Sequence, residues 1–102
     1  MEKLYRMAQG YNKRFPNGVD PFKMATFLLE ECGEVASEIS LWEDMGIKRQ
    51  KHGEPSKEKL AGEIKQALAA LIKIAVYYKV EKEIESSINK TLEIMESEGL
   101  ID

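Results

Sequence analysis

The sequence predicts an all-α protein, an antiparallel bundle of about four helices in a single domain that spans residues 1–102. Apolar residues recur at three- and four-residue spacing in four segments, and no segment alternates apolar and polar residues as a half-buried strand does. Proline and glycine fall between these segments. A chain of 102 residues suffices for one small domain, and a bundle this small often completes its core by dimerising.

The first two helices are separated by a Pro-Asn-Gly break. An apolar stripe predicts the first over about residues 3–15, and residues 16–18 end it. Asp20 can accept hydrogen bonds from the free N–H groups of a following helix, and Pro21 suits the first helical position. This second helix is expected to run to about residue 45, because Gly46 is a good C-terminal stop.

Two further helices are expected after a linker at residues 47–55. The third runs from about 56 to 78 and the fourth from about 81 to 98. The joint at residues 79–80 carries no strong stop signal, so two helices and one bent helix both fit the pattern.

Composition excludes several classes of protein. No apolar run approaches the roughly 20 residues of a membrane span, and the opening MEKLYRMAQG has no apolar stretch, so we expect no signal peptide and a cytoplasmic protein. One cysteine, Cys32, and one histidine, His52, exclude an internal disulfide, a multi-cysteine zinc site and a histidine-rich metal site. The net charge of −3 argues against nucleic acid as the main partner.

The second helix carries acids and no bases. Between Lys23 and Lys48 there are six acids and no basic residue: Glu30, Glu31, Glu34, Glu38, Glu43 and Asp44. Like charges four residues apart repel on a helix, and a cation from elsewhere would offset them. A helical wheel separates Glu30, Glu31, Glu34 and Glu38 from a broad apolar face, which we expect in the core: Ala25, Leu28, Leu29, Cys32, Val35, Ala36 and Ile39.

A solvated acidic face is the simplest interpretation of this wheel. Two features speak against it. Phe27, Leu41 and Met45 share the stripe of Glu30 and Glu34 and bracket these acids. Gly33 lies mid-helix, where glycine costs roughly 1 kcal/mol relative to alanine, and close approach of another helix or a ligand would explain it.

A carboxylate on the third helix completes a candidate site. Glu63 lies at the edge of an apolar face, where it either reaches water or is paired or metal-bound. Glu31 and Glu34 are three residues apart and point the same way, so antiparallel packing could direct all three carboxylates into one cleft. Several carboxylates suit Mg²⁺ or Mn²⁺, and Mg²⁺ held in this way often meets substrate phosphates. This pattern indicates phosphoryl chemistry on a nucleotide.

Residues 29–36, LEECGEVA, resemble the EExxE helix of the MazG-like all-α nucleoside triphosphate pyrophosphohydrolases. Residues 21–25 before it, and the spacing to a second helix that begins at residues 60–64, are similar too. The resemblance implies hydrolysis of an NTP or dNTP to the monophosphate and pyrophosphate, with Mg²⁺ as cofactor and Mn²⁺ as a possible substitute. It also implies a homodimer or homotetramer whose partner chain forms part of the active site.

Carried over by position, Glu31, Glu34 and Glu63 would be metal ligands. Glu34 and Glu30 would be the catalytic residues, with Glu30 a further ligand or a group that orients or deprotonates water. The second motif of the family reads ExxD, and here Gln66 stands at the position of the aspartate. An amide oxygen can ligate Mg²⁺, but it brings no negative charge.

Three basic residues are candidates for substrate binding. Lys48 and Arg49 in the linker could reach a triphosphate, although a solvated loop is the simpler interpretation. The resemblance implies a lysine and an asparagine near the start of the last helix. Ser87 and Thr91 stand at the aligned positions, and Asn89 and Lys90 are neighbours that are out of phase. The departures at 66, 87 and 91 leave an alternative function open: a catalytically degenerate MazG-like helical module that binds nucleotide, metal or a partner subunit.

Overall fold

The computed structural model describes residues 1–43 and 54–102. These residues form four α-helices and one short 3-10 helix, and no strand occurs among them. The all-α prediction is therefore confirmed. In chain order the elements are α1 (Glu2–Arg14), η1 (Pro16–Gly18), α2 (Pro21–Trp42), α4 (Lys57–Tyr78) and α5 (Glu81–Ser97). None of the described helices has the length and apolar character needed to cross a membrane.

Side-chain caps fix the starts of the two long helices. The Asp20 carboxylate accepts hydrogen bonds from the backbone N–H groups of Phe22 and Lys23, both at 3.0 Å. The Ser56 hydroxyl accepts one from the N–H of Lys59 at 3.2 Å. These bonds satisfy N–H groups that the first helical turn leaves free.

Two residues, Lys79 and Val80, separate α4 from α5. Lys79 adopts the left-handed conformation, with φ of 57°, and its N–H reaches back to the last turn of α4. The joint therefore holds two helices rather than one bent helix. This backbone conformation sets the direction in which α5 leaves α4.

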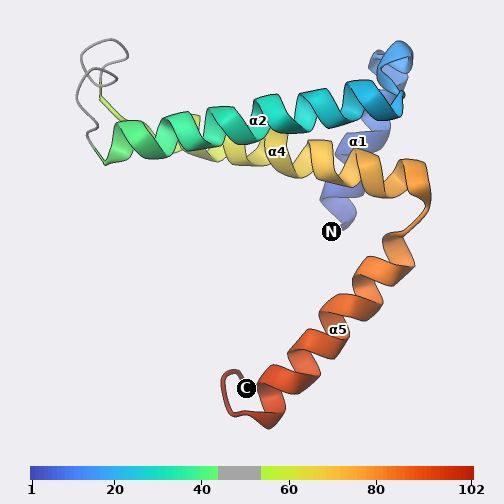
Figure 1. Cartoon of the computed structure of the whole chain (residues 1–102), viewed down its shortest axis with the longest axis vertical. Coiled ribbons are helices and arrows are strands. Elements are labelled where there is room, and N and C mark those ends of the chain that lie inside the picture. Colours follow the sequence, from blue (N-terminus) through green and yellow to red (C-terminus); the bar gives the residue numbers. More distant parts are fainter. Residues whose placement is uncertain (44–53) are drawn as a thin grey trace.

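Three of the four helices pack together. α2 and α4 run antiparallel along their length, and α1 lies across α4 (Figure 1). The core they share is small, and half of its members are alanine: Ala8, Met24, Leu41, Ala69, Ile72 and Ala75. Alanine lets helix axes approach closely, but it buries little apolar surface per residue. The packed unit is consequently thin.

Helix α5 does not join this packing. It runs away from the α2–α4 pair (Figure 1), and none of its residues is buried. Its apolar stripe, which includes Ile88, Leu92 and Met95, faces solvent. The radius of gyration is 16.9 Å, against about 13 Å for a compact domain of 100 residues. A single chain thus leaves the four-helix bundle open.

The orientation of α2 corrects one prediction. Most of its broad apolar face is exposed: Leu29 is 75% exposed, Ile39 is 53% exposed, and Cys32 is exposed rather than in the core. Only Leu28 and Val35 of that face are half-buried. The stripe turned toward α4 instead includes the buried Glu38. Apolar periodicity finds the face that a helix buries, but it does not specify whether the same chain provides the partner.

The close approach of another helix that was expected at Gly33 is not observed among the residues described, and Gly62 on α4 has none either. A Cβ atom built on either glycine meets nothing within 4 Å. Within the described chain, no helix approaches α2 or α4 at these points closely enough to require glycine.

Substitution of Lys79 tests the joint between α4 and α5. The left-handed conformation costs a non-glycine residue about 1–2 kcal/mol, and the extra chain entropy of glycine offsets roughly 0.5–1 kcal/mol of this. We expect Lys79→Gly to raise the free energy of unfolding in a denaturant titration by up to about 1 kcal/mol. The control, Lys65→Gly in the middle of α4, should lower it by a similar amount.

Candidate metal centre

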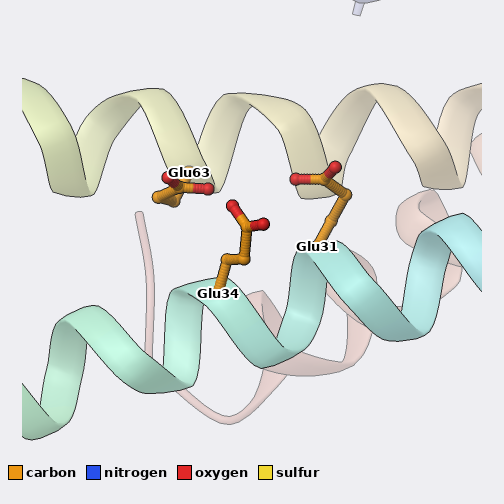
Figure 2. A group of neighbouring side chains, drawn as sticks. All are labelled: Glu31, Glu34 and Glu63. Atoms are coloured by element: carbon orange, nitrogen blue, oxygen red, sulfur yellow. The ribbon is translucent and has the colours of Figure 1, made fainter.

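Three carboxylates meet between α2 and α4. Glu31 and Glu34 extend from α2, Glu63 extends from α4, and their carboxyl groups converge in the space between the helices (Figure 2). One carboxylate oxygen from each residue lies within 4.8 Å of the other two. Glu31 and Glu63 are half-buried, and Glu34 is exposed. These residues are called the acidic cluster below.

The spacing on both helices produces this convergence. Glu31 and Glu34 are separated by almost one helical turn, so they share a face of α2. One turn further along α2 lies Glu38, and one turn before Glu63 on α4 lies Lys59. Because the helices are antiparallel, these two also meet, with Lys59 Nζ 3.2 Å from Glu38 Oε1. The same helix pair thus contains one neutralised pair and one cluster of like charges.

The Glu38–Lys59 ion pair is a feature that the sequence analysis missed. Glu38 is only 5% exposed, and its Oε2 has no hydrogen-bond partner. The four-residue intervals from Glu34 to Glu38 and from Lys59 to Glu63 were the available signal. These intervals place Glu34 and Glu38 on one face of α2 and Lys59 and Glu63 on one face of α4. The two faces meet when the helices pack antiparallel. A buried carboxylate that is paired on one oxygen alone still needs a further donor or cation.

The proximity of the carboxylates changes their acidity. A hydrogen bond with Glu34 raises the pKa of Glu63, and burial and the negative charges of Glu34, Glu31 and Glu38 raise it further. Burial also raises the pKa of Glu31, and the charges of Glu34 and Glu30 add to this. The acidic cluster therefore holds a proton more readily than separated glutamates do.

A hard divalent cation fits the same oxygens. Three carboxylates without a nitrogen or sulfur ligand suit Mg²⁺, Mn²⁺ or Ca²⁺ better than Zn²⁺. Ligands on opposite sides of Mg²⁺ lie about 4.2 Å apart, twice the usual bond length of 2.0–2.1 Å. Only one pair among three ligands can be opposite, and adjacent oxygens lie about 2.9 Å apart, so the three oxygens, which lie within 4.8 Å of one another, would have to move inward to bind one ion. Glu31, Glu34 and Glu63 would hold the ion.

Two other predicted site residues lie next to the acidic cluster. Glu30 is exposed on α2, and its charge contributes to the raised pKa of Glu31. Gln66 lies one turn after Glu63, where its side-chain oxygen accepts a hydrogen bond of 3.4 Å from the Tyr11 hydroxyl. Gln66 and Glu31 line the same cavity.

Of the three basic residues predicted to bind substrate, the structure describes Lys90, and it does not bring this residue to the acidic cluster of its own chain. Lys90 is exposed on α5, which leaves the α2–α4 pair (Figure 1). The role of Lys90 in substrate binding stays a prediction. Lys48 and Arg49 lie outside the described residues.

The acidic cluster has a hollow on each side. One, of about 180 Å³, is polar and is lined by Glu34, Ser37, Glu38, Lys59 and Glu63 together with Leu41. The other, of about 130 Å³, lies between α1, α2 and α4 and contains Glu31 and Gln66 among aromatic side chains. A ligand bound at the cluster could therefore extend along the helix pair in either direction.

Comparison of the chain with protein-family models, curated proteins and solved structures found no match.

The raised pKa values predict how stability depends on pH in the absence of metal. The folded chain binds more protons than the unfolded chain at pH values between the ordinary glutamate pKa and the raised values. In EDTA, we expect the contribution of the cluster to the free energy of unfolding to increase as the pH falls from 7 toward 5. This gain is complete below the unfolded pKa and is lost as the pH rises through the folded values.

Glu34→Gln is the matched test, because it removes the charge that acts on both neighbours. At pH 7 in EDTA, it should raise the free energy of unfolding by a few tenths of a kcal/mol to about 1 kcal/mol, and it should flatten the pH dependence. Glu43→Gln, at the exposed end of the same helix, should change neither. If Glu34→Gln destabilises the protein at pH 7, the carboxylates do not repel one another as described.

Proposed function

We propose that the protein is a Mg²⁺-dependent nucleoside triphosphate pyrophosphohydrolase that converts an NTP or dNTP to the monophosphate and pyrophosphate. The acidic cluster, contributed by two antiparallel helices and flanked by two hollows, is the observation that carries the proposal. Its three members are the acidic residues among the four metal ligands that the MazG-like resemblance implies, the fourth being Gln66. A divalent cation would offset the mutual repulsion of these three carboxylates.

In the proposed reaction, a water oxygen attacks the α-phosphorus and the bond from that phosphorus to the bridging oxygen of the β-phosphate breaks. A bound Mg²⁺ would neutralise phosphate charge and acidify the attacking water. Glu31 and Glu63, the half-buried members, would fix the ion. Glu34 is the most exposed member and also lines the polar hollow, so it is placed to accept the proton from water. Glu30, exposed beside it, would act through its charge.

Lys59 is the cation that the structure places beside the polar hollow. Its ammonium group already contacts Glu38 at 3.2 Å, and its side chain is 53% exposed. Departing pyrophosphate in this hollow would be within reach of Lys59. This would supply the positive charge that the described part of the chain does not provide through Lys90.

A catalytically degenerate module is the second candidate function. The observation that favours it is the hydrogen bond between Gln66 and Tyr11, which engages the side chain that replaces the acidic residue of the second motif. Such a module would bind nucleotide, metal or a partner subunit without turnover. In the first candidate function, three carboxylates suffice for hydrolysis. In the second, they do not.

We also propose that the chain functions as a homodimer or homotetramer. The exposed face of α2 and the unpacked stripe of α5 support this, because both carry large apolar residues into solvent. A second copy could cover them and complete the core. Lys90 would then be able to approach the acidic cluster of the partner.

Pyrophosphate release from a panel of NTPs and dNTPs, with Mg²⁺, Mn²⁺ or EDTA, tests the proposed activity. We expect metal-dependent release with the monophosphate as co-product. Glu34→Gln should lower kcat/KM by about 100-fold or more, because it removes both a ligand and a proton acceptor, while Glu43→Gln should leave it unchanged. If the folded wild-type protein releases none, Gln66→Asp should create activity provided that the missing charge alone is the cause.

Light scattering combined with size exclusion tests the oligomer. We expect the wild-type mass to be twice or four times that of the 11.6 kDa chain. Leu29→Asp should produce monomers without loss of helix content, because this side chain is 75% exposed in the isolated chain. The control is Lys65→Glu on the exposed side of α4, which should not change the mass. A monomeric wild-type protein at micromolar concentration would contradict the proposal.

A further inference from the structure

The hollow beside Glu31 has properties that the acidic cluster alone does not explain. It lies between α1, α2 and α4, and three aromatic side chains, Tyr11, Phe15 and Phe27, contribute to its lining. Ala69 and Ala70 form part of the α4 side, where their short side chains leave room. A cavity bounded by aromatic rings and alanines suits a flat, mainly apolar group. It is called the ring cavity below.

The size of the ring cavity limits what can enter it. Its volume is about 130 Å³. Pockets that enclose drug-sized ligands have roughly 300–1,000 Å³, whereas an engineered cavity of about 150 Å³ binds benzene. The ring cavity therefore matches one six-membered ring, and a fused bicyclic ring would extend beyond it toward the adjoining hollow that shares Phe15, Phe27 and Lys73. The rest of a larger ligand would have to lie outside it.

Polar groups at the cavity indicate which single rings it would prefer. The Gln66 side chain lines the cavity, and its oxygen already accepts the Tyr11 hydroxyl hydrogen bond. Its amide nitrogen is a donor, so it can bind a ring carbonyl or ring nitrogen. The amide is neutral and therefore neither attracts nor repels an uncharged ring. Lys73 adds a second donor to the same lining.

The position of the cavity connects this ring to the acidic cluster. Glu31 belongs to both, so a molecule with its ring in the cavity would have its remaining atoms beside the cluster. On α4, Glu63, Gln66 and Ala70 follow one another at intervals of about one turn, so the order from cluster to cavity is the order along the helix. The ligand would thus lie parallel to the α2–α4 pair.

We propose that the ring cavity binds the single-ring base of a pyrimidine nucleotide, and that Gln66, positioned by Tyr11, is the specificity-determining residue. The phosphate position in this proposal rests on the proposed function, but the base position rests on the cavity alone. Gln66 acts in base recognition rather than as the metal ligand that the motif position implies.

Binding of nucleosides tests the cavity separately from the metal chemistry. Uridine, cytidine and adenosine are titrated into the protein in EDTA, with affinities taken from NMR chemical shifts. We expect both pyrimidine nucleosides to bind about tenfold or more tightly than adenosine, because the purine exceeds the cavity. Equal or tighter binding of adenosine, or no binding of any nucleoside by the folded protein, would overturn the proposal.

Matched variants locate the binding. Ala70→Leu fills the cavity and should weaken uridine binding by about tenfold or more, while Ala61→Leu, at an exposed position on the same helix, should have no effect. Gln66→Leu keeps the side-chain size, removes the amide and should weaken uridine binding roughly 3- to 10-fold. If both the Ala70 and Gln66 variants retain wild-type uridine affinity, the base does not lie in this cavity.

Mn²⁺ binding, followed by electron paramagnetic resonance, distinguishes the two proposals. Ala70→Leu and Gln66→Leu should retain Mn²⁺ affinity, which also shows that these variants are folded. Glu34→Gln should lose Mn²⁺ affinity but keep uridine binding in EDTA. If the wild-type protein shows no pyrophosphohydrolase activity, or does not bind Mn²⁺, but still prefers pyrimidine nucleosides, the proposed function is contradicted and the ring-cavity proposal is not.

Discussion

The structure depends on a conflict of charge between its two longest helices. α2 and α4 pack along their whole length, yet the stripe that α2 turns toward α4 contains Glu31, Glu34 and Glu38. Carboxylates at this spacing oppose the packing unless something neutralises them. Lys59 does so for Glu38. For the remaining pair and Glu63, a proton or a cation can do so, and the neighbouring negative charges contribute to the raised pKa of Glu63.

The outer face of α2 carries apolar side chains that no other part of the described chain covers. Leu29 and Ile39 face solvent, and α5 presents an unpacked apolar stripe of its own. The core of six small or medium-sized side chains offers little to compensate for this exposure. Metal binding would act on the inner face of α2 and association on its outer face, so both would stabilise the one helix that carries Glu31 and Glu34. Site and assembly are therefore expected to be coupled energetically.

Local chemistry made much of this fold predictable. Asp20 and Ser56 cap helices as their side chains indicate, and the three-residue spacing of Glu31 and Glu34 anticipated a shared direction. The orientation of α2 was not predictable, because its apolar face is the stronger pattern and only the geometry of α4 decides which side packs. The path of α5 depends on the backbone angles of one residue, Lys79, which carries no sequence signal for a left-handed turn.

Gln66 illustrates how a departure from a motif can be consistent with its surroundings. An aspartate at this position would bring a further negative charge to a cavity already lined by Glu31, whose pKa is raised by burial and by neighbouring acids. The amide avoids that repulsion and accepts the hydroxyl hydrogen of Tyr11. It also leaves donor N–H groups beside an apolar hollow, where a carboxylate would offer only acceptors. The residue that weakens the resemblance at the metal thus makes the adjoining cavity better suited to a neutral ring.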